Sequence, residues 1–588
     1  MAEKLINLKI NGKEVTVPEG TTILNAAKSI GIKIPSLCYT PDLPPWASCG
    51  ICIVHPVGST RMMRACCTTV TESMDIVTHD PGLVQARRTV LELILSNHPD
   101  ECLTCSRNGK CELQTLAAEF GLREIRFEKI LKDQPIDNSN EAIVLDRNKC
   151  INCGRCVETC QIMQNVWALE YTGRGDKTFI GPVAGISLAD SPCVRCGQCA
   201  VHCPTGAIYS THSNRKIWDR LSDPEYTRVV QIAPAVRVAL GEEFGYAPGT
   251  LETKKIYTAL RQIGFDYVFD TNFSADLTIM EEGTEFVNRF TAGALKGHLP
   301  QFTSCCPAWI DYCEKNYHDL LPNLSTAKSP QQMMGATIKT YWAQKMNLDP
   351  KKIFSMSVMP CTAKKWELQR DKNMSSAGTR RDVDTSITTR EFARLIRQAG
   401  IDFETLEETE ADSPLGQYTG AGTIFGVTGG VMEAALRTAY KLITHDELGD
   451  VTFMNVRGMD GVKEAKIDIK GIEIRLCIIH QLGNVDAIIQ KIRKEIADGK
   501  EPSYHFVEVM ACRGGCIGGG GQPYYVTDEI RAARAAGLYS DDEKSTIRVS
   551  HKNPDIQKVY KEFFGEPCGE KSHRLLHTNY TKRDAYAD

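Results

Sequence analysis

Cysteine spacing is the feature that most constrains how this chain can fold. Residues 150–160 read C-x2-C-x2-C-x3-C, and residues 193–203 repeat the pattern with Pro204 directly behind it. In folds that hold two iron–sulfur clusters, the fourth cysteine of each run ligates the other cluster. A zinc site does not explain a doubled run of this kind. The spacing therefore predicts two 4Fe-4S clusters, one held by Cys150, Cys153, Cys156 and Cys203 and the other by Cys160, Cys193, Cys196 and Cys199.

Composition indicates where such a chain works. It has 588 residues, which predicts several domains, and 24 cysteines, most of them in C-x-x-C groups. The N-terminus lacks the apolar region and cleavage site of a secretory signal, and no apolar run approaches the roughly 20 residues of a membrane span. The net charge of −4 gives no reason to expect nucleic acid binding. We expect a cytoplasmic protein, in which grouped cysteines bind metal more often than they form disulfides.

The first 78 residues predict a small β-grasp domain. "LINLKINGKEVTV" alternates apolar and polar residues around Asn11-Gly12, which is a hairpin signal, and "TTILNAAKSIG" has helical spacing after a threonine cap. A C-x10-C-x2-C-x13-C pattern within this region resembles that of 2Fe-2S ferredoxins, with a structural zinc site as the alternative. Cys67 could replace Cys66, but "ACCTTV" aligns Cys66 with the last ligand of related domains. The expected ligands are Cys38, Cys49, Cys52 and Cys66.

The next group, "HPDECLTCSRNGKC", contains one histidine and three cysteines. These four side chains could form a structural zinc site. Because the group follows a 2Fe-2S domain, it instead resembles the His-ligated 4Fe-4S cluster in the large peripheral subunit of complex I. The expected ligands are His98, Cys102, Cys105 and Cys111. No dinucleotide fingerprint or phosphate loop accompanies these four clusters, so we expect them to relay electrons to chemistry further along the chain.

From about residue 220 the pattern alternates strands and helices and predicts an α/β domain. The strand-like stretches "IFSMSVMP" and "HFVEVMA" end at Cys361 and Cys512, where α/β sheets usually place their active sites. Five thiols remain for this site, and a cubane cluster needs four. An ordinary fifth cluster with one bystander thiol is the alternative to a specialised site. The five thiols are Cys305, Cys306, Cys361, Cys512 and Cys516.

Three motifs around these thiols, "TSCCPAW", "MPCTAKKWE" and "EVMACRGGCIGGGGQP", closely resemble the three signatures of FeFe hydrogenases. The tail "FGEPCGEKSHRLLHTNY" looks like the C-terminal wrap of that family. The resemblance implies an H-cluster, in which a cubane is bridged by a thiolate to a two-iron unit with CO, cyanide and azadithiolate ligands. It implies Cys306, Cys361, Cys512 and Cys516 as cubane ligands, with Cys516 as the bridge, and Cys305 as the proton donor and acceptor.

The resemblance also implies a proton path and a set of pocket residues. The proton path would continue from Cys305 through Glu282, Ser325, Glu285 and Arg289. Lys364 would contact one cyanide, Ala233 and Pro234 the other, and Gln331 a CO ligand; Met359 and Met510 would pack around the two-iron unit, and Glu367 matches a pocket residue without a defined role. Four thiols receive no role: Cys67, Cys313, Cys477 and Cys568.

The expected organisation is multidomain α/β. We expect a 2Fe-2S domain at 1–78, a 4Fe-4S domain with one histidine and three cysteine ligands at 79–118, a linker at 119–141, a two-cluster ferredoxin-like domain at 142–212, the H-cluster domain at 213–540 and a C-terminal small-subunit-like segment at 541–588.

The resemblance implies reversible H2 oxidation, with the two-iron unit supplied by maturation proteins. The complex-I-like N-terminal half favours a catalytic subunit of an NAD(P)-linked, electron-bifurcating complex whose flavin lies on a partner chain. The absence of an extra C-terminal 2Fe-2S domain argues against bifurcation. Alternatives are a stand-alone hydrogenase that uses ferredoxin, a non-catalytic H2 or redox sensor, an iron–sulfur carrier, and a complex-I-like electron-transfer subunit. The proton-path residues, present together, favour catalysis.

Overall fold

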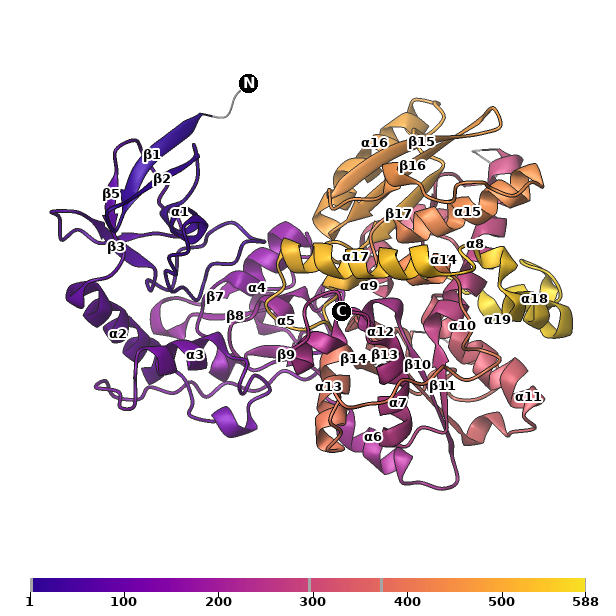
Figure 1. Ribbon diagram of the computed structural model, residues 1–588, viewed down its shortest axis with the longest axis horizontal. Coiled ribbons are helices and arrows are strands. Elements are labelled where there is room, and N and C mark those ends of the chain that lie inside the picture. The colour runs from indigo at the N-terminus through magenta and orange to yellow at the C-terminus, as the bar shows by residue number, and fades with distance from the viewer. Residues whose placement is uncertain (1–3, 294–297, 371–373, 587–588) are drawn as a thin grey trace.

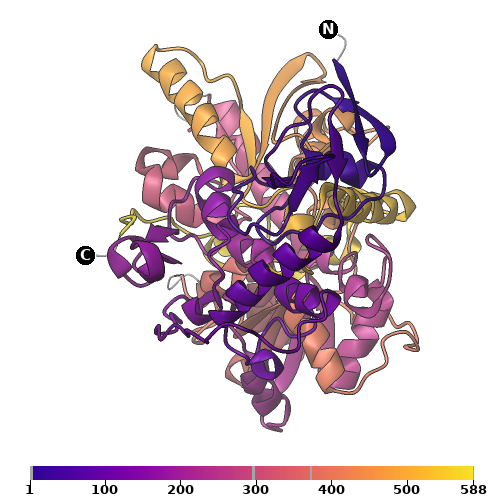
Figure 2. The ribbon, with the colours of Figure 1, turned by 90° about the vertical axis from the view of Figure 1, so that its left-hand side faces the viewer.

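The computed structural model describes residues 4–293, 298–370 and 374–586. The small N-terminal domains extend to one side of a larger C-terminal domain (Figure 1). Seen from the end, the N-terminal sheet and the helices that follow it lie in front of the larger domain (Figure 2). No helix in the described part of the chain has the length and apolar character that a membrane crossing requires.

A five-stranded sheet of order β2-β1-β5-β3-β4 forms the N-terminal domain. The predicted hairpin is present: β1 pairs antiparallel with β2, and Asn11 and Gly12 have the positive φ values, 50° and 75°, that a type I′ turn requires. Thr22 caps the predicted helix by accepting a hydrogen bond from the Asn25 backbone. The elements are β1 (Leu5–Ile10), β2 (Lys13–Pro18), α1 (Ile23–Ser29), β3 (Ile53–Pro56), β4 (Met63–Arg64) and β5 (Asp75–Val77).

The middle of the chain has little regular structure between its cysteine loops. Two antiparallel strand pairs, β6 with β9 and β7 with β8, surround two short helices that each follow a cysteine loop. The elements are α2 (Pro81–Ser96), α3 (Glu112–Glu119), β6 (Ile143–Leu145), α4 (Arg155–Glu158), β7 (Glu170–Thr172), β8 (Phe179–Gly181), α5 (Gln198–His202), β9 (Ile208–Ser210) and α6 (Asn214–Leu221).

Two four-stranded sheets form the centre of the C-terminal domain. The first has the order β11-β10-β13-β14 and is fully parallel, and every residue of β13 is buried, as expected for a sheet covered on both faces. Its strands are β10 (Thr227–Ile232), β11 (Tyr267–Asp270), β13 (Ile353–Met359) and β14 (Thr385–Thr388).

The second sheet has the order β12-β17-β16-β15, in which only β15 is antiparallel to its neighbour. Its strands are β12 (Gln301–Phe302), β15 (Val462–Ile469), β16 (Ile472–His480) and β17 (Phe506–Met510). The helices of this domain are α7 (Thr253–Ile263), α8 (Thr271–Ala292), α9 (Pro307–Asn316), α10 (Pro330–Thr337), α11 (Ala343–Lys345), α12 (Ala363–Glu367), α13 (Thr389–Gln398), α14 (Gly420–Ile424), α15 (Gly430–Thr444) and α16 (Val485–Ala497).

The C-terminal segment wraps around this domain. Helix α17 (Asp528–Lys544) crosses it between the two sheets, and α18 (Pro554–Val559) and α19 (Glu570–Leu576) follow at its edge (Figure 1). The expected boundary after residue 540 falls inside α17.

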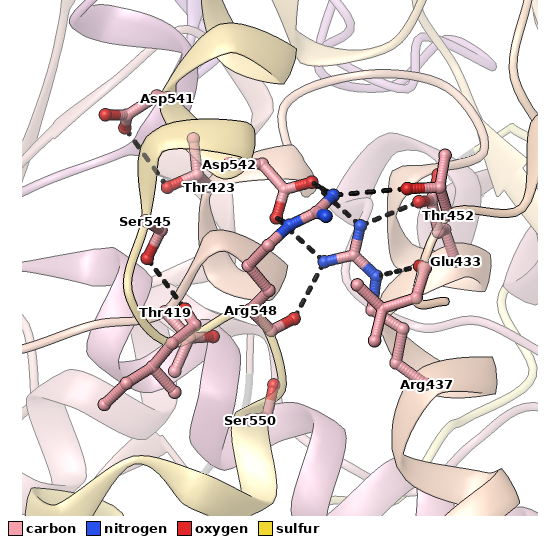
Figure 3. Close-up of polar contacts among 12 residues, drawn as sticks. Thr419, Thr423, Glu433, Arg437, Thr452, Asp541, Asp542, Ser545, Arg548 and Ser550 are labelled. Atoms are coloured by element: carbon pink, nitrogen blue, oxygen red, sulfur yellow. Dashed lines mark hydrogen bonds and ion pairs between the residues drawn. The ribbon is translucent and has the colours of Figure 1, made fainter. Parts of the chain in front are cut away.

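A buried charge network fastens α17 to α15. The Asp542 carboxylate accepts two hydrogen bonds from Arg437, both 2.8 Å, and one of 2.7 Å from Arg548 (Figure 3). Arg437 also donates to Glu433 at 2.7 Å, and Arg457 donates to the same carboxylate at 2.8 Å. Because burying such charges is costly unless each is paired, the network makes the position of α17 dependent on several partners at once.

Candidate active site

The five thiols predicted for the active site line one cavity between the two sheets. Cys305 and Cys306 follow β12, Cys361 follows β13, and Cys512 and Cys516 follow β17, so all five come from loops at the carboxyl ends of strands. The space in and around this cavity that protein atoms do not fill, part of it open to solvent, is about 730 Å³. Six further predicted pocket residues also line it: Ala233, Pro234, Gln331, Met359, Lys364 and Met510.

Burial dominates the electrostatics of these thiols. It raises the pKa of Cys361 to about 12, and it raises the pKa values of Cys306, Cys512 and Cys516 as well. Thiols in such a place stay protonated unless a cation compensates the thiolate charge. All five are free cysteines, so no disulfide accounts for their convergence.

Glu367, whose role the sequence left undefined, is the counter-ion of Lys364. The Lys364 ammonium lies 3.0 Å and 3.1 Å from the two carboxylate oxygens and also donates to the backbone carbonyl of Cys305 at 3.1 Å. Burial alone would lower the pKa of Lys364, but Glu367 and Cys361 raise it. The same carboxylate accepts from Gln331 at 2.8 Å and from Ser329 at 2.9 Å. These contacts hold a protonated lysine beside the cysteine pair.

A second buried glutamate, Glu282 of α8, lies near Cys305. Glu282 is fully buried, and neither of its carboxylate oxygens accepts a well-aligned hydrogen bond among the described residues, although the Ser325 hydroxyl and the Ser304 backbone N–H lie close enough to lower its pKa. Burial, followed by the charge of Glu285, raises the pKa of Glu282 to about 8. Burial and then Glu282 raise the pKa of Cys305 far above its usual range. The thiol and the carboxyl group are therefore both protonated near neutral pH.

Glu285 lies one helical turn further toward the surface and is well paired. Ser325 donates to it at 2.9 Å, and Arg289 donates at 2.6 Å. Thr326 donates through its backbone N–H at 3.0 Å and through its hydroxyl at 3.1 Å. All the predicted proton-path residues thus lie in one region.

The fourth cysteine of each run lies near the first three cysteines of the other run. Burial raises the pKa values of Cys150, Cys153 and Cys156, and the charge of Cys203, which belongs to the later run, raises them further. Cys160 of the earlier run lines a second cavity together with Cys193, Cys196 and Cys199.

His98 lines a third cavity together with Cys102, Cys105 and Cys111. Nδ1 of His98 is buried without a hydrogen-bond partner in the described part of the chain. Burial lowers the pKa of His98 to about 4, which leaves the imidazole neutral, as a metal ligand must be.

In the N-terminal domain the adjacent cysteines Cys66 and Cys67 have different surroundings. Cys66 is buried and its thiol contacts those of Cys38 and Cys52, and Cys38 in turn contacts Cys49. Cys67 is exposed and its thiol points to the carbonyl of Arg64 at 3.7 Å.

The cysteine groups are close to one another in a defined order. A Cβ atom on Gly520, in the active-site loop, would lie 2.2 Å from the carbonyl oxygen of Cys196, so the backbones of the two loops touch. Ser48 of the N-terminal domain donates to the carbonyl of Cys153 at 3.1 Å, and a Cβ on Gly206 would lie 2.4 Å from the Cys105 thiol. Both N-terminal groups therefore adjoin the ferredoxin-like domain, and that domain adjoins the active site.

Comparison with known families identifies the larger domain. Residues 226–520, half of the chain, match the family described as the iron only hydrogenase large subunit, C-terminal domain. The chain belongs to the FeFe hydrogenase family. The predicted resemblance is thereby confirmed. Residues 528–583 of this hydrogenase match the iron hydrogenase small subunit, which includes all of α17.

The N-terminal third of this hydrogenase matches three iron–sulfur families. These are a 2Fe-2S iron-sulfur cluster binding domain at residues 3–81, the NADH-ubiquinone oxidoreductase-G iron-sulfur binding region at 87–126, and a 4Fe-4S dicluster domain at 149–211. A multidomain α/β protein with 2Fe-2S and 4Fe-4S domains before a hydrogenase domain is the organisation expected from the cysteine spacing together with the family resemblance.

Three relatives show the extent of the likeness. The NADP-reducing hydrogenase subunit HndD of Solidesulfovibrio fructosivorans is 46% identical, over 98% of this chain and 99% of its own length. Iron hydrogenase 1 of Clostridium pasteurianum is 40% identical over 97% of this chain and 99% of its own. The solved FeFe hydrogenase HydA1 of Chlamydomonas reinhardtii is 42% identical with a TM-score of 0.56, covering 63% of this chain and 99% of its own.

Several residues that contact the predicted path carry no sequence signal. Thr326 and His577 meet at the hydroxyl and Nδ1, 2.7 Å apart, and the Tyr580 hydroxyl donates to the carbonyl of Ser325. His577 and Tyr580 come from the C-terminal segment, more than 250 residues from the positions they contact. An isolated threonine or histidine is ordinary in sequence, and only the docked fold shows these contacts.

Proposed function

We propose that this hydrogenase catalyses reversible H2 oxidation at an H-cluster in the main cavity, with its cubane held by Cys306, Cys361, Cys512 and Cys516. The observation that carries the proposal is five convergent buried thiols around one cavity. A cubane uses four, which leaves one thiol, and the family resemblance assigns acid–base work to Cys305. The donor set fits the group, because thiols with pKa values raised by burial need a bound cation to become thiolates.

When bound, the H-cluster supplies a Lewis-acidic iron and a basic amine that together split H2 heterolytically. The chain surrounds it with fixed groups. Lys364, held by Glu367, offers a cation beside the pocket, as the family's cyanide contact requires. The remaining contacts proposed for the two-iron unit come from Ala233, Pro234, Gln331, Met359 and Met510.

Protons would move through side chains of this chain. Cys305 exchanges a proton with the buried site and then with Glu282. Glu282 has a pKa near 8, which suits a group that must both gain and lose a proton near neutral pH. Ser325 and Glu285 are hydrogen-bonded to each other at 2.9 Å, and Arg289 at 2.6 Å from Glu285 completes the route toward the surface.

Electrons would leave through one 2Fe-2S and three 4Fe-4S clusters, held by the ligand sets predicted from the sequence. The order of contacts supports a relay in which the Cys193 group receives electrons from the active site and the Cys150 group passes them on. Both N-terminal groups adjoin the Cys150 group, so we propose two outlets, one at the 2Fe-2S domain and one at the His98 cluster.

The domain division follows the predicted ranges, with one change. We propose the boundaries 1–78, 79–118, 119–141, 142–212 and 213–527, and a C-terminal segment from 528. The change from 540 keeps α17 intact and agrees with the start of the small-subunit match.

For the physiological partner, we propose an NAD(P)-linked complex in the cytoplasm. The name of the relative HndD, NADP-reducing hydrogenase subunit, supports this, since the two chains align over nearly their whole lengths. Flavin- and NAD-binding subunits would dock at the N-terminal outlets, any electron bifurcation would occur on those partners, and maturation proteins would deliver the two-iron unit. A stand-alone hydrogenase using ferredoxin is the second candidate, supported by the likeness to iron hydrogenase 1.

The first test is H2-dependent reduction of methyl viologen by the matured, anaerobic chain. The wild type should be active, and Cys305→Ala should lose nearly all activity with unchanged iron content, a fall of about 10²-fold or more for loss of a positioned acid–base group. Cys67→Ala is the matched control, because it removes the exposed member of the other adjacent cysteine pair.

The other outcomes are equally informative. A wild-type chain that shows infrared bands of CO and cyanide but no activity would be a sensor. Equal activity in the wild type and Cys305→Ala would show that protons leave by another route.

A further inference from the structure

One contact between the C-terminal segment and the proposed proton path passes through the Thr326 hydroxyl group. Thr326 Oγ1 lies 3.1 Å from Glu285 Oε1 and 2.7 Å from His577 Nδ1. The backbone fixes this contact: Ala327 and His577 form an antiparallel bridge, and the Thr578 N–H donates to the Thr326 carbonyl at 2.8 Å. The histidine is therefore held in place independently of its own side-chain bonds.

The other ring nitrogen of His577 contacts a second buried carboxylate. Nε2 lies 3.0 Å from Glu281 Oε2. Glu281 is also held by the Tyr560 hydroxyl and by the Cys568 backbone N–H at 2.7 Å. Glu281, Cys568 and His577 could in principle surround a metal ion, but the protein already provides a hydrogen-bond partner for each potential ligand atom. No cation is needed to explain this group.

The hydrogen atoms in this chain of contacts can be arranged in two ways. Nε2 faces a carboxylate oxygen, so it carries a proton in both. If the imidazole is cationic, Nδ1 donates to Thr326, and the Thr326 hydroxyl is free to donate to Glu285. If the imidazole is neutral, Nδ1 must accept, and the single Thr326 hydroxyl proton turns toward it. Glu285 then loses that donor and keeps the Thr326 N–H, Ser325 and Arg289.

We propose that His577 is a positioning residue for proton transfer, whose protonation sets the direction of the Thr326 hydroxyl and thereby whether Glu285 receives its hydrogen bond. A bond from a hydroxyl to a carboxylate stabilises the ionised form. Glu285 is thus a weaker proton acceptor when His577 is charged. This inference rests on the proposed proton path and makes the C-terminal segment a part of it.

The charged and titratable groups around His577 are few. Glu281 faces Nε2 from α8, and beyond Thr326 lies the ion pair of Glu285 with Arg289. His573, on α19, stacks on His577 with ring centroids 4.5 Å apart and is itself exposed. The Tyr560 hydroxyl and the Cys568 thiol contact Glu281 and not the imidazole.

The test is the pH profile of H2 oxidation and of H2 evolution between pH 5 and 8.5, measured on the matured full chain. Iron content and the infrared CO and cyanide bands serve as checks of integrity. The variants are Thr326→Val, which keeps the backbone donor but removes the hydroxyl, Thr326→Ser, which keeps both, and His577→Gln, which cannot titrate. His573→Gln is the matched control. His573 stacks on His577 but makes no hydrogen bond to Thr326 or Glu285 among the described residues.

We expect the wild-type profile to contain a component due to protonation of His577. Thr326→Val and His577→Gln should each abolish it, and the double variant should add nothing further, because both act on one bond. Thr326→Ser and His573→Gln should retain it. The inference is wrong if the component survives either of the first two variants, if their effects add, or if His573→Gln alone removes it.

Failure of the underlying proton path would look different. Glu285→Gln would then leave the rates unchanged. If Glu285→Gln is inactive while the His577 and Thr326 variants keep the wild-type profile, only the inference about His577 fails.

Discussion

Two glutamates three residues apart on α8 have opposite surroundings. Glu285 accepts hydrogen bonds from Arg289, Ser325 and Thr326, whereas Glu282 is buried with no well-aligned hydrogen bond among the described residues. A carboxylate without well-aligned donors is costly to bury, so Glu282 is protonated. Glu285 has donors and does not need a proton. The position nearest Cys305 is therefore occupied by a neutral acid, and the outer position by a paired anion.

The raised pKa of Glu282 leads to a prediction about pH. Since the folded-state value is about 8, Glu282 carries its proton below pH 8 and loses it above. H2 evolution from reduced methyl viologen, which needs this proton to move inward, should fall on the alkaline side with an apparent pKa near 8. Glu282→Gln should lower the rate at every pH by about 10²-fold or more, because an amide cannot relay a proton.

A matched variant distinguishes this effect from damage to the pocket. Glu367→Gln alters a different buried carboxylate, one that contacts Lys364 and not Cys305, so any alkaline limb due to Glu282 should persist in its residual activity. An alkaline limb that persists unchanged in residual activity of Glu282→Gln would show that another group causes it.

Sequence patterns predicted the elements that carry ligands better than the contacts between distant elements. The strands that lead to Cys361 and Cys512 and the hairpin at Asn11-Gly12 have local signals, namely apolar runs and turn residues. The role of His577 depends on the docking of a tail onto a loop some 250 residues earlier. No periodicity encodes that contact, because it arises from tertiary packing.

At the scale of elements, the attachment of α17 depends on buried charges. Arg437→Ala would leave Asp542 with Arg548 and Arg457 only, and Glu433 with Arg457 only. Removing one partner of a buried ion pair costs about 3–5 kcal/mol of unfolding free energy, so the temperature of thermal unfolding should fall clearly. Arg493→Ala, which breaks a partly exposed pair with Asp319, is the control and should cost about 1 kcal/mol or less.

The result would also bear on how the C-terminal segment is attached. If Arg437→Ala unfolds at the same temperature as Arg493→Ala, the apolar contacts of α17 suffice and the network of Figure 3 contributes little. A separate early transition in Arg437→Ala would show that the C-terminal segment detaches before the rest unfolds.

For the whole molecule, the contact between the ferredoxin-like domain and the active-site loop is the point through which all electrons would pass. Gln198 donates to the carbonyl of Gly518 at 3.0 Å, and Thr362 donates to the carbonyl of Arg195 at 2.7 Å. Arg195 also pairs with Asp311 at 2.6 Å, and both side chains are buried. These bonds fix the distance between two cysteine groups that belong to different domains.

Gly520→Ala tests whether that distance matters. Its Cβ would lie 2.2 Å from the Cys196 carbonyl oxygen, so one of the two backbones must move. H2-dependent reduction of the accessory clusters, followed by electron paramagnetic resonance, should slow several-fold, while exchange of H2 with deuterated water, which needs no net electron transfer, should continue. Gly449→Ala, where a Cβ has no heavy-atom neighbour within 4 Å, should leave both unchanged. Equal losses of exchange and of cluster reduction would mean instead that the methyl group distorts the active-site cavity, since the neighbouring Gly519 lines it.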